Sequence, residues 1–235
     1  MIRNNLNIEG IPAILWGEPS DKLFIAVHGN MSSKDDEVIV IFAEGAIDRG
    51  YQVLSFDLPE HGDRKGGYPC KVQNCVSDLT AIMKYAHTIS SSISLFACSM
   101  GVYFSLLAYR DLQLEKCLFL SPVLNMERII SHMMSCSNVS EDRLKIENEI
   151  ETPIGHTLYW DYYFYVKTHP IDTWDKPTAI LYGSDDNISE FVVVSEFAQR
   201  YHCKLQVLEH GEHYFHTDEQ LDYYKQWLED NIFAI

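Results

Sequence analysis

Ser99 is the residue whose type and surroundings best fit nucleophilic chemistry. The apolar run Ser92–Cys98 precedes it, and a helix-period segment beginning at Gly101 follows it. A nucleophile elbow needs this arrangement, because a sharp strand-to-helix turn exposes the serine hydroxyl and requires small residues two positions before and after it. Those positions hold Ala97 and Gly101, so the motif is Ala-x-Ser-x-Gly. The sequence predicts a serine nucleophile here; a serine that merely ends a strand is the alternative.

A loop after an earlier apolar run would complete a site for acyl transfer. Such a site needs two preorganised N–H donors for the oxyanion of the tetrahedral intermediate. The residue after the nucleophile, Met100, would supply one backbone N–H. Asn30 follows the apolar run Leu23–Val27 and the turn His28-Gly29, so its backbone N–H is the candidate for the other. We interpret His28 as a residue that shapes this loop, not as a base.

Two loops near the C-terminus carry the residue types that would activate a serine. A serine hydroxyl is a poor nucleophile unless a histidine accepts its proton and a carboxylate orients that histidine. Asp185 and Asp186 follow one apolar run, and His210, His213 and His216 follow the last one. The three histidines would also suit a metal, but no HExxH motif or carboxylate triad accompanies them. We therefore predict neither a metal nor another cofactor.

The order of these loops resembles that of the α/β-hydrolase superfamily. The resemblance is carried by a strand followed by His28-Gly29, by the Asp-x-Pro-x-His-Gly motif of residues 57–62, and by the x-Ser-x-Gly motif of residues 98–101. It covers nearly the whole chain, from the first buried strand to the C-terminus. The loop that contains His61 and Asp63 is typically structural in such proteins, so the resemblance implies no direct catalytic role for these two residues.

The resemblance also implies which acid and which histidine serve the nucleophile. The superfamily's Gly-x-x-Asp turn selects Asp186, with Asp185 as a rival. Its Gly-x-His pattern ahead of the final helix selects His213, with His210 and His216 as rivals. The implied chain order is nucleophile, acid, base.

Short apolar runs alternate with longer helix-period segments along the chain. This alternation predicts βαβ units, and hence an α/β fold with a mostly parallel sheet flanked by helices. An N-terminal hairpin is expected over residues 6–9 and 11–16. The other expected strands are 23–27, 51–56, 92–98, 116–121, 177–182 and 204–209, and the expected helices are 35–49, 74–87, 101–110, 190–201 and 218–233.

Residues 122–176 interrupt the alternation after the sixth strand. This segment has no clear buried strand, and it carries three methionines, an acidic stretch and an aromatic cluster at residues 159–165. We predict a small cap-like insertion within a single domain of residues 1–235, because the segment is short for an independent core. Its Met and Tyr side chains would either form an apolar acyl pocket over the site or complete the core around the inserted helices.

The composition narrows the classes of partner. The net charge of −16, with 18 basic against 34 acidic residues, argues against nucleic acid and anionic membranes. No apolar run approaches the roughly 18 residues of a membrane span, and no signal peptide is recognised, so a cytoplasmic location is expected.

None of the six cysteines forms a CxxC pair, which favours reduced thiols; a Cys70–Cys75 bridge is the alternative.

Together these features predict a serine hydrolase that acts on a small-molecule acyl substrate. A medium-chain or aromatic ester is favoured over a charged one, because so acidic a protein repels anions. A thioesterase, a C–C bond hydrolase and a cofactor-free perhydrolase would use the same residues, and a non-catalytic binding protein would retain the same fold. The sequence does not indicate an oligomeric state.

Overall fold

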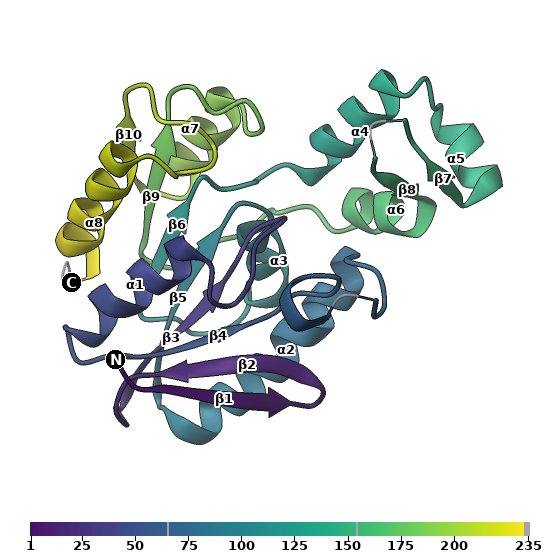
Figure 1. Ribbon diagram of the computed structural model, residues 1–235. Helices are drawn as coiled ribbons and strands as arrows, with labels where there is room; N and C mark the ends of the chain where they lie inside the picture. The colour runs from purple at the N-terminus through teal and green to yellow at the C-terminus, as the bar shows by residue number, and fades with distance from the viewer. Residues whose placement is uncertain (65, 154, 233–235) are drawn as a thin grey trace.

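A single eight-stranded sheet forms the centre of the computed structural model, which describes residues 1–64, 66–153 and 155–232 (Figure 1). The strand order is β1-β2-β4-β3-β5-β6-β9-β10. Strands β3 to β10 of this sheet run parallel, and β1 and β2 form an antiparallel hairpin at one edge. The strands are β1 (Arg3–Ile8), β2 (Ile11–Trp16), β3 (Lys22–Val27), β4 (Gln52–Phe56), β5 (Ser92–Cys98), β6 (Cys117–Leu120), β9 (Thr178–Gly183) and β10 (Lys204–Leu208).

Helices cover both faces of this sheet. On one face α1 (Glu37–Ile47) and α8 (Asp218–Ile232) pack against Phe24, Phe96 and their neighbours. On the other face α2 (Val72–Ile89), α3 (Met100–Ala108) and α7 (Phe191–Arg200) pack against Leu23, Ile25 and Leu95. Successive residues of β3 thus enter opposite cores, which explains why the buried strands are continuous apolar runs.

Residues 122–176 fold into helices and a short hairpin to one side of the sheet (Figure 1). The elements are α4 (Met126–Cys136), α5 (Glu141–Glu147), β7 (Glu149–Glu151), β8 (Thr157–Tyr159) and α6 (Trp160–Thr168). Their buried side chains, Ile130, Leu144 and Leu158 among them, join the same apolar cluster as α2 and α3. The residue pattern predicts no strand here, because β7 and β8 are only three residues each and too short for an alternating pattern.

The predicted α/β architecture with its mostly parallel sheet is confirmed, and so is the N-terminal hairpin. Helix α2 begins at Val72, two residues before the predicted start, and the predicted end of the last helix at Phe233 lies outside the described residues. None of the helices described is both long and apolar enough to span a membrane. All six cysteines are free thiols, so the structure contains no Cys70–Cys75 disulfide.

Candidate active site at the strand ends

Ser99 occupies a strained turn between β5 and α3. Its φ and ψ are 49° and −125°, a backbone conformation that costs a non-glycine residue free energy and persists only where neighbouring contacts enforce it. The Ser99 N–H donates to the Leu120 carbonyl at 3.0 Å, and the Ser99 carbonyl accepts from Val102 and Val123 at 3.1 Å each. Three hydrogen bonds from β6, α3 and the segment after β6 therefore hold the turn.

The small residues of the motif are required by close packing. A Cβ on Gly101 would lie 2.4 Å from the carbonyl oxygen of His28, and a Cβ on Gly29 would lie 2.9 Å from the Cβ of Ser99. Ala97, at the end of β5, is fully buried. The position two residues after the nucleophile, Gly101, therefore demands glycine, whereas the position two residues before it, Ala97, accommodates a methyl group.

Ser99, His213 and Asp186 form a hydrogen-bonded chain. The Ser99 Oγ lies 2.8 Å from His213 Nε2, and His213 Nδ1 lies 2.7 Å from Asp186 Oδ2. The Asp186 side chain is fully buried and the His213 side chain is 16% exposed. The second carboxylate oxygen of Asp186 accepts the backbone N–H groups of Ile188 and Ser189 at 2.8 Å each. With a carboxylate on Nδ1, Nε2 is free to accept the serine proton.

Two glycines bring the acid loop and the histidine loop together. A Cβ on Gly183 would lie 2.3 Å from the Gly211 carbonyl oxygen. The same carbonyl accepts the Asp185 N–H at 2.8 Å, and the His210 N–H donates to Ser184 Oγ at 2.7 Å. The two loops thus share a backbone contact that sets the Asp186–His213 distance.

The rival residues lie away from Ser99. Asp185 pairs with His210 across 3.5 Å, and both side chains are exposed. His216 pairs with Glu212 across 3.3 Å, also at the surface. Of the candidate acids and bases, the structure brings only Asp186 and His213 to the serine.

The predicted oxyanion donors line the cavity beside Ser99. Asn30 and Met100 both belong to its wall. Within residues 1–64, 66–153 and 155–232, no carbonyl or side chain accepts a hydrogen bond from the backbone N–H of either residue. Unpaired backbone N–H groups on a cavity wall are the type of donor that can bind an oxyanion.

His61 is a residue whose contact with this site the sequence did not reveal. Its Nε2 lies 3.2 Å from Asn30 Oδ1 and its Nδ1 lies 2.7 Å from the Pro59 carbonyl. Burial lowers the pKa of His61, but the neighbouring Cys70 thiol and the Pro59 carbonyl outweigh burial, so its pKa is raised overall. His61 therefore fixes the side chain of Asn30, and only the three-dimensional contact shows this.

The loop that carries His61 is wound around the buried carboxylate of Asp57. That carboxylate accepts Lys34 N at 2.9 Å, Lys34 Nζ at 2.6 Å and Asp63 N at 2.9 Å. A Cβ on Gly62 would lie 2.2 Å from Asp57 Oδ1. The Asp and the Gly of the Asp-x-Pro-x-His-Gly motif are therefore partners in one turn, which holds the intervening His61 at the Asn30 loop.

His28 links this loop to the turn before Asn30. Its Nε2 accepts the Leu58 N–H at 3.0 Å, and its Nδ1 donates to the Gly29 carbonyl at 2.7 Å. Burial lowers the pKa of His28 to about 4, so the ring is neutral at pH 7. Both ring nitrogens are occupied by backbone groups, which fits a role in shaping the loop.

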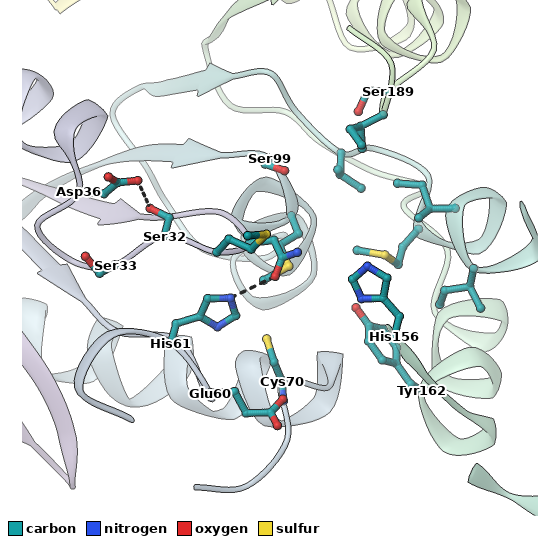
Figure 2. Close-up of a pocket in the computed structure, with 18 of the residues that line it drawn as sticks. Ser32, Ser33, Asp36, Glu60, His61, Cys70, Ser99, His156, Tyr162 and Ser189 are labelled. Atoms are coloured by element: carbon teal, nitrogen blue, oxygen red, sulfur yellow. Dashed lines mark hydrogen bonds between the residues drawn. The ribbon is translucent and has the colours of Figure 1, made fainter. Parts of the chain in front are cut away.

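A cavity of about 2110 Å³ opens beside Ser99. One wall consists of the loops around Asn30 and His61, and the opposite wall comes from residues 122–176 (Figure 2). His156 and Tyr162 face the cavity from that opposite wall. Its apolar lining from the same segment includes Val123, Leu124, Met126, Ile129, Ile130, Met133 and Leu158.

The residues described contain no cluster of three or more His, Cys, Asp or Glu side chains that would hold a metal ion. The three C-terminal histidines diverge instead, with His213 at the serine and the other two at the surface.

Comparison with known proteins places the chain by its fold. No protein-family model and no curated protein matches the sequence. Among solved structures, it is similar to Est1E from Butyrivibrio proteoclasticus with ferulic acid bound, with a TM-score of 0.78 and 21% identity over 97% of this chain and 96% of the other. It is also similar to a putative hydrolase from Agrobacterium vitis S4, with a TM-score of 0.80 and 14% identity over 98% of each chain.

A third similar structure is an esterase from Pyrococcus furiosus, with a TM-score of 0.70 and 19% identity over 97% of this chain and 89% of the other. At this level of identity the likeness establishes the fold: the chain has the α/β-hydrolase fold.

Proposed function

We propose that the protein is a serine hydrolase that cleaves carboxylic esters through an acyl-enzyme on Ser99. The observation that carries this proposal is the Ser99–His213–Asp186 chain, with contacts of 2.8 and 2.7 Å, at a strained turn beside the cavity. A buried aspartate, a histidine and a serine in this order are the parts that nucleophilic acyl transfer requires.

In the first step His213 Nε2 takes the proton of Ser99 as the hydroxyl oxygen attacks the ester carbonyl carbon. Asp186 keeps the imidazole in the productive tautomer and stabilises its protonated form. The backbone N–H groups of Asn30 and Met100 bind the oxyanion. A donor of this kind is worth about 3 kcal/mol of transition-state stabilisation.

In the second step the intermediate collapses and the alcohol leaves with the proton held by His213. Water then enters, His213 accepts its proton, and the resulting hydroxide attacks the acyl carbon. The second tetrahedral intermediate releases the acid and returns the proton to Ser99. Water is the only co-reactant that this sequence consumes besides the ester.

The substrate class follows from the wall opposite Ser99. Residues 122–176 act in this proposal as a cap whose Met126, Ile129 and Met133 side chains bind an apolar acyl group. A medium-chain or aromatic acyl group suits such a wall better than an anion does, since the chain carries a net charge of −16. The similar Est1E structure holds ferulic acid, an aromatic acid, which supports an aromatic ester as one substrate to test.

The direct test is labelling with a fluorophosphonate probe, followed by assays on p-nitrophenyl esters, a hydroxycinnamate ester and an acyl thioester. Wild type should be labelled and should hydrolyse oxygen esters faster than the thioester, and Ser99→Ala and His213→Ala should lose both activities. Labelling that survives Ser99→Ala would refute the assignment. Absence of turnover across the panel, with labelling intact, would refute the ester substrate.

A further inference from the structure

Two cysteines meet at the cavity wall, away from the Ser99–His213–Asp186 chain. Cys75 is buried in the first turns of α2, and Cys70 is half-buried two residues before that helix. Their Sγ atoms are 3.6 Å apart. Figure 2 shows the Cys70 sulfur directed toward the cavity beside His61. One thiol of the pair therefore reaches the space that substrates enter, and the other lies behind it.

The local structure holds Cys70 in place and favours its thiolate. Its backbone N–H donates to Glu60 Oε2 at 2.7 Å. Cys70 also lies at the N-terminus of α2, where the N-cap residue Lys71 makes no side-chain capping bond, and helix N-termini stabilise thiolates. The hydrogen bond from Cys75 and, against the effect of burial, the neighbouring His61 lower the pKa of Cys70.

The pKa values of the two thiols are shifted in opposite directions. Burial, together with the nearby Cys70, raises the pKa of Cys75 well above its ordinary value. The pair therefore combines a cavity-lining thiol of lowered pKa with a buried thiol of raised pKa behind it. That asymmetry suits a reaction in which the first sulfur is oxidised and the second resolves the product.

The other cysteines lack this combination. Cys98 and Cys117 are fully enclosed in the core, and burial raises the pKa of Cys203 to about 11. Cys136 is exposed on α4, and its Sγ lies 3.5 Å from His132 Nε2 with no second thiol beside it. Of the six cysteines, only Cys70 both lines the cavity and contacts a second sulfur atom.

We propose that Cys70 and Cys75 form a dithiol site that reacts with small hydroperoxides, with Cys70 as the attacking sulfur and Cys75 as the resolving one. The product is an intrachain disulfide at the wall of the cavity. This site uses none of the residues of the Ser99 chain, so it does not depend on the proposed hydrolase activity.

The chemistry balances with the peroxide as the sole oxidant. The Cys70 thiolate attacks one peroxide oxygen, an S–O bond forms, the O–O bond breaks, and the leaving oxygen departs as water or an alcohol after taking up a proton. The Cys75 sulfur then attacks the sulfenic sulfur of Cys70, the S–S bond forms, the S–O bond breaks, and hydroxide leaves with the Cys75 proton as water. The two sulfurs together lose two electrons and the peroxide gains them.

The required movement is small. A disulfide has an S–S length of about 2.05 Å, so the sulfurs must approach by roughly 1.5 Å. Cys75 is fixed in the core by α2, whereas Cys70 lies in the irregular segment before the helix. Cys70 is therefore the residue that moves, and its sulfur turns from the cavity toward Cys75.

The chain sequence makes this product easy to detect. Lys71 lies between the two cysteines, so trypsin separates peptide 66–71 from peptide 72–84. Hydrogen peroxide treatment of the native protein should lower the intact mass by two hydrogen atoms. After the remaining free thiols are then blocked, we expect these two peptides to be joined. A reducing agent should separate them again. The same result is expected in Ser99→Ala, and failure to detect the joined peptides in native protein would overturn the proposal.

Variants assign the two roles. In Cys75→Ala, oxidation should stop at the sulfenic acid of Cys70, which a cyclic 1,3-diketone traps on peptide 66–71. In Cys70→Ser no adduct should form on Cys75. The matched control is Cys136→Ser, which removes an exposed cysteine and should leave the Cys70–Cys75 product unchanged. An adduct on Cys75 in Cys70→Ser would reverse the assignment and overturn it.

The rate at which iodoacetamide modifies Cys70 can be measured in the wild-type protein, so this test does not depend on the folding of a variant. At pH 7, iodoacetamide should modify Cys70 roughly fivefold faster than the more exposed Cys136, because only the thiolate reacts. In concentrated urea the two rates should converge. Equal rates in the native protein would contradict a structure-based activation of Cys70.

Discussion

Gly183 and Gly211 touch so closely that a Cβ on Gly183 would lie 2.3 Å from the Gly211 carbonyl oxygen. Gly183 ends β9 ahead of Asp186, and Gly211 precedes His213 in the loop after β10. Neighbouring parallel strands bring the two loops to one edge of the sheet, but the glycine contact determines how closely they approach. The 2.7 Å bond between Asp186 and His213 depends on it.

Gly183→Ala should therefore impair hydrolysis without changing the fold. The added methyl group pushes the loop that carries Asp186 away from the loop that carries His213. A misplaced catalytic group typically lowers the rate by about 10²-fold. We expect kcat for a p-nitrophenyl ester to fall by roughly 10- to 100-fold while KM changes little. Gly45→Ala is the matched control, because a Cβ there meets only ordinary contacts at 3.8 Å. Unchanged kcat in Gly183→Ala would show that the loops tolerate separation.

The two adjacent aspartates provide a second comparison. Asp186→Asn removes the charge that faces His213, so we expect kcat to fall by about 10³-fold or more. Asp185→Asn alters an exposed pair with His210, and its kcat should stay within about twofold of wild type. Steady-state kinetics on one ester distinguishes the two, and equal losses would contradict the choice of Asp186.

His28 gives a pH-dependent contribution to stability. Burial lowers its pKa to about 4 from 6.5, so the unfolded chain takes up a proton before the folded chain as the pH falls. The stabilising contribution is complete above about pH 6.5 and is lost between about pH 6.5 and 4, amounting to about 3 kcal/mol. His28→Gln should be less stable than wild type at pH 7, and this difference should shrink toward pH 4.

Urea unfolding at several pH values measures this effect. The control is His87→Gln, which changes an exposed histidine on α2 and should leave the pH dependence as in wild type. Parallel curves for wild type and His28→Gln would show that His28 does not titrate on unfolding in this range.

Much of the architecture was predictable from local signals. Continuous apolar runs predicted the parallel strands, and the alternation of Ala97, Ser99 and Gly101 predicted a turn that the structure shows at a φ of 49°. The reason is that these features depend on neighbours in sequence. The elbow requires small residues wherever strand and helix meet, so the residue types reveal it.

The choice between Asp185 and Asp186 was not available from residue types alone. Both are acids in one turn, and they differ in which way the turn directs them: Asp186 into a buried contact and Asp185 to the surface. Only the resemblance to a known loop pattern favoured one of them. The contact of His61 with Asn30 joins residues 31 positions apart. No periodic pattern in the sequence indicates such a contact.

The apolar wall formed by residues 122–176 should control acyl-chain preference. Ile129 lines the cavity from α4, and each methylene removed from water contributes about 0.8 kcal/mol. Ile129→Ser replaces an apolar contact with a hydroxyl, so we expect KM for an octanoate ester to rise roughly fivefold while KM for an acetate ester stays constant, because the short acyl group does not reach α4. Ile146→Ser is the control: Ile146 lies in the same inserted segment but is 79% exposed and absent from the cavity wall. A KM that rises equally for both esters would indicate a general disturbance of the site, and unchanged KM values for both would remove α4 from substrate binding.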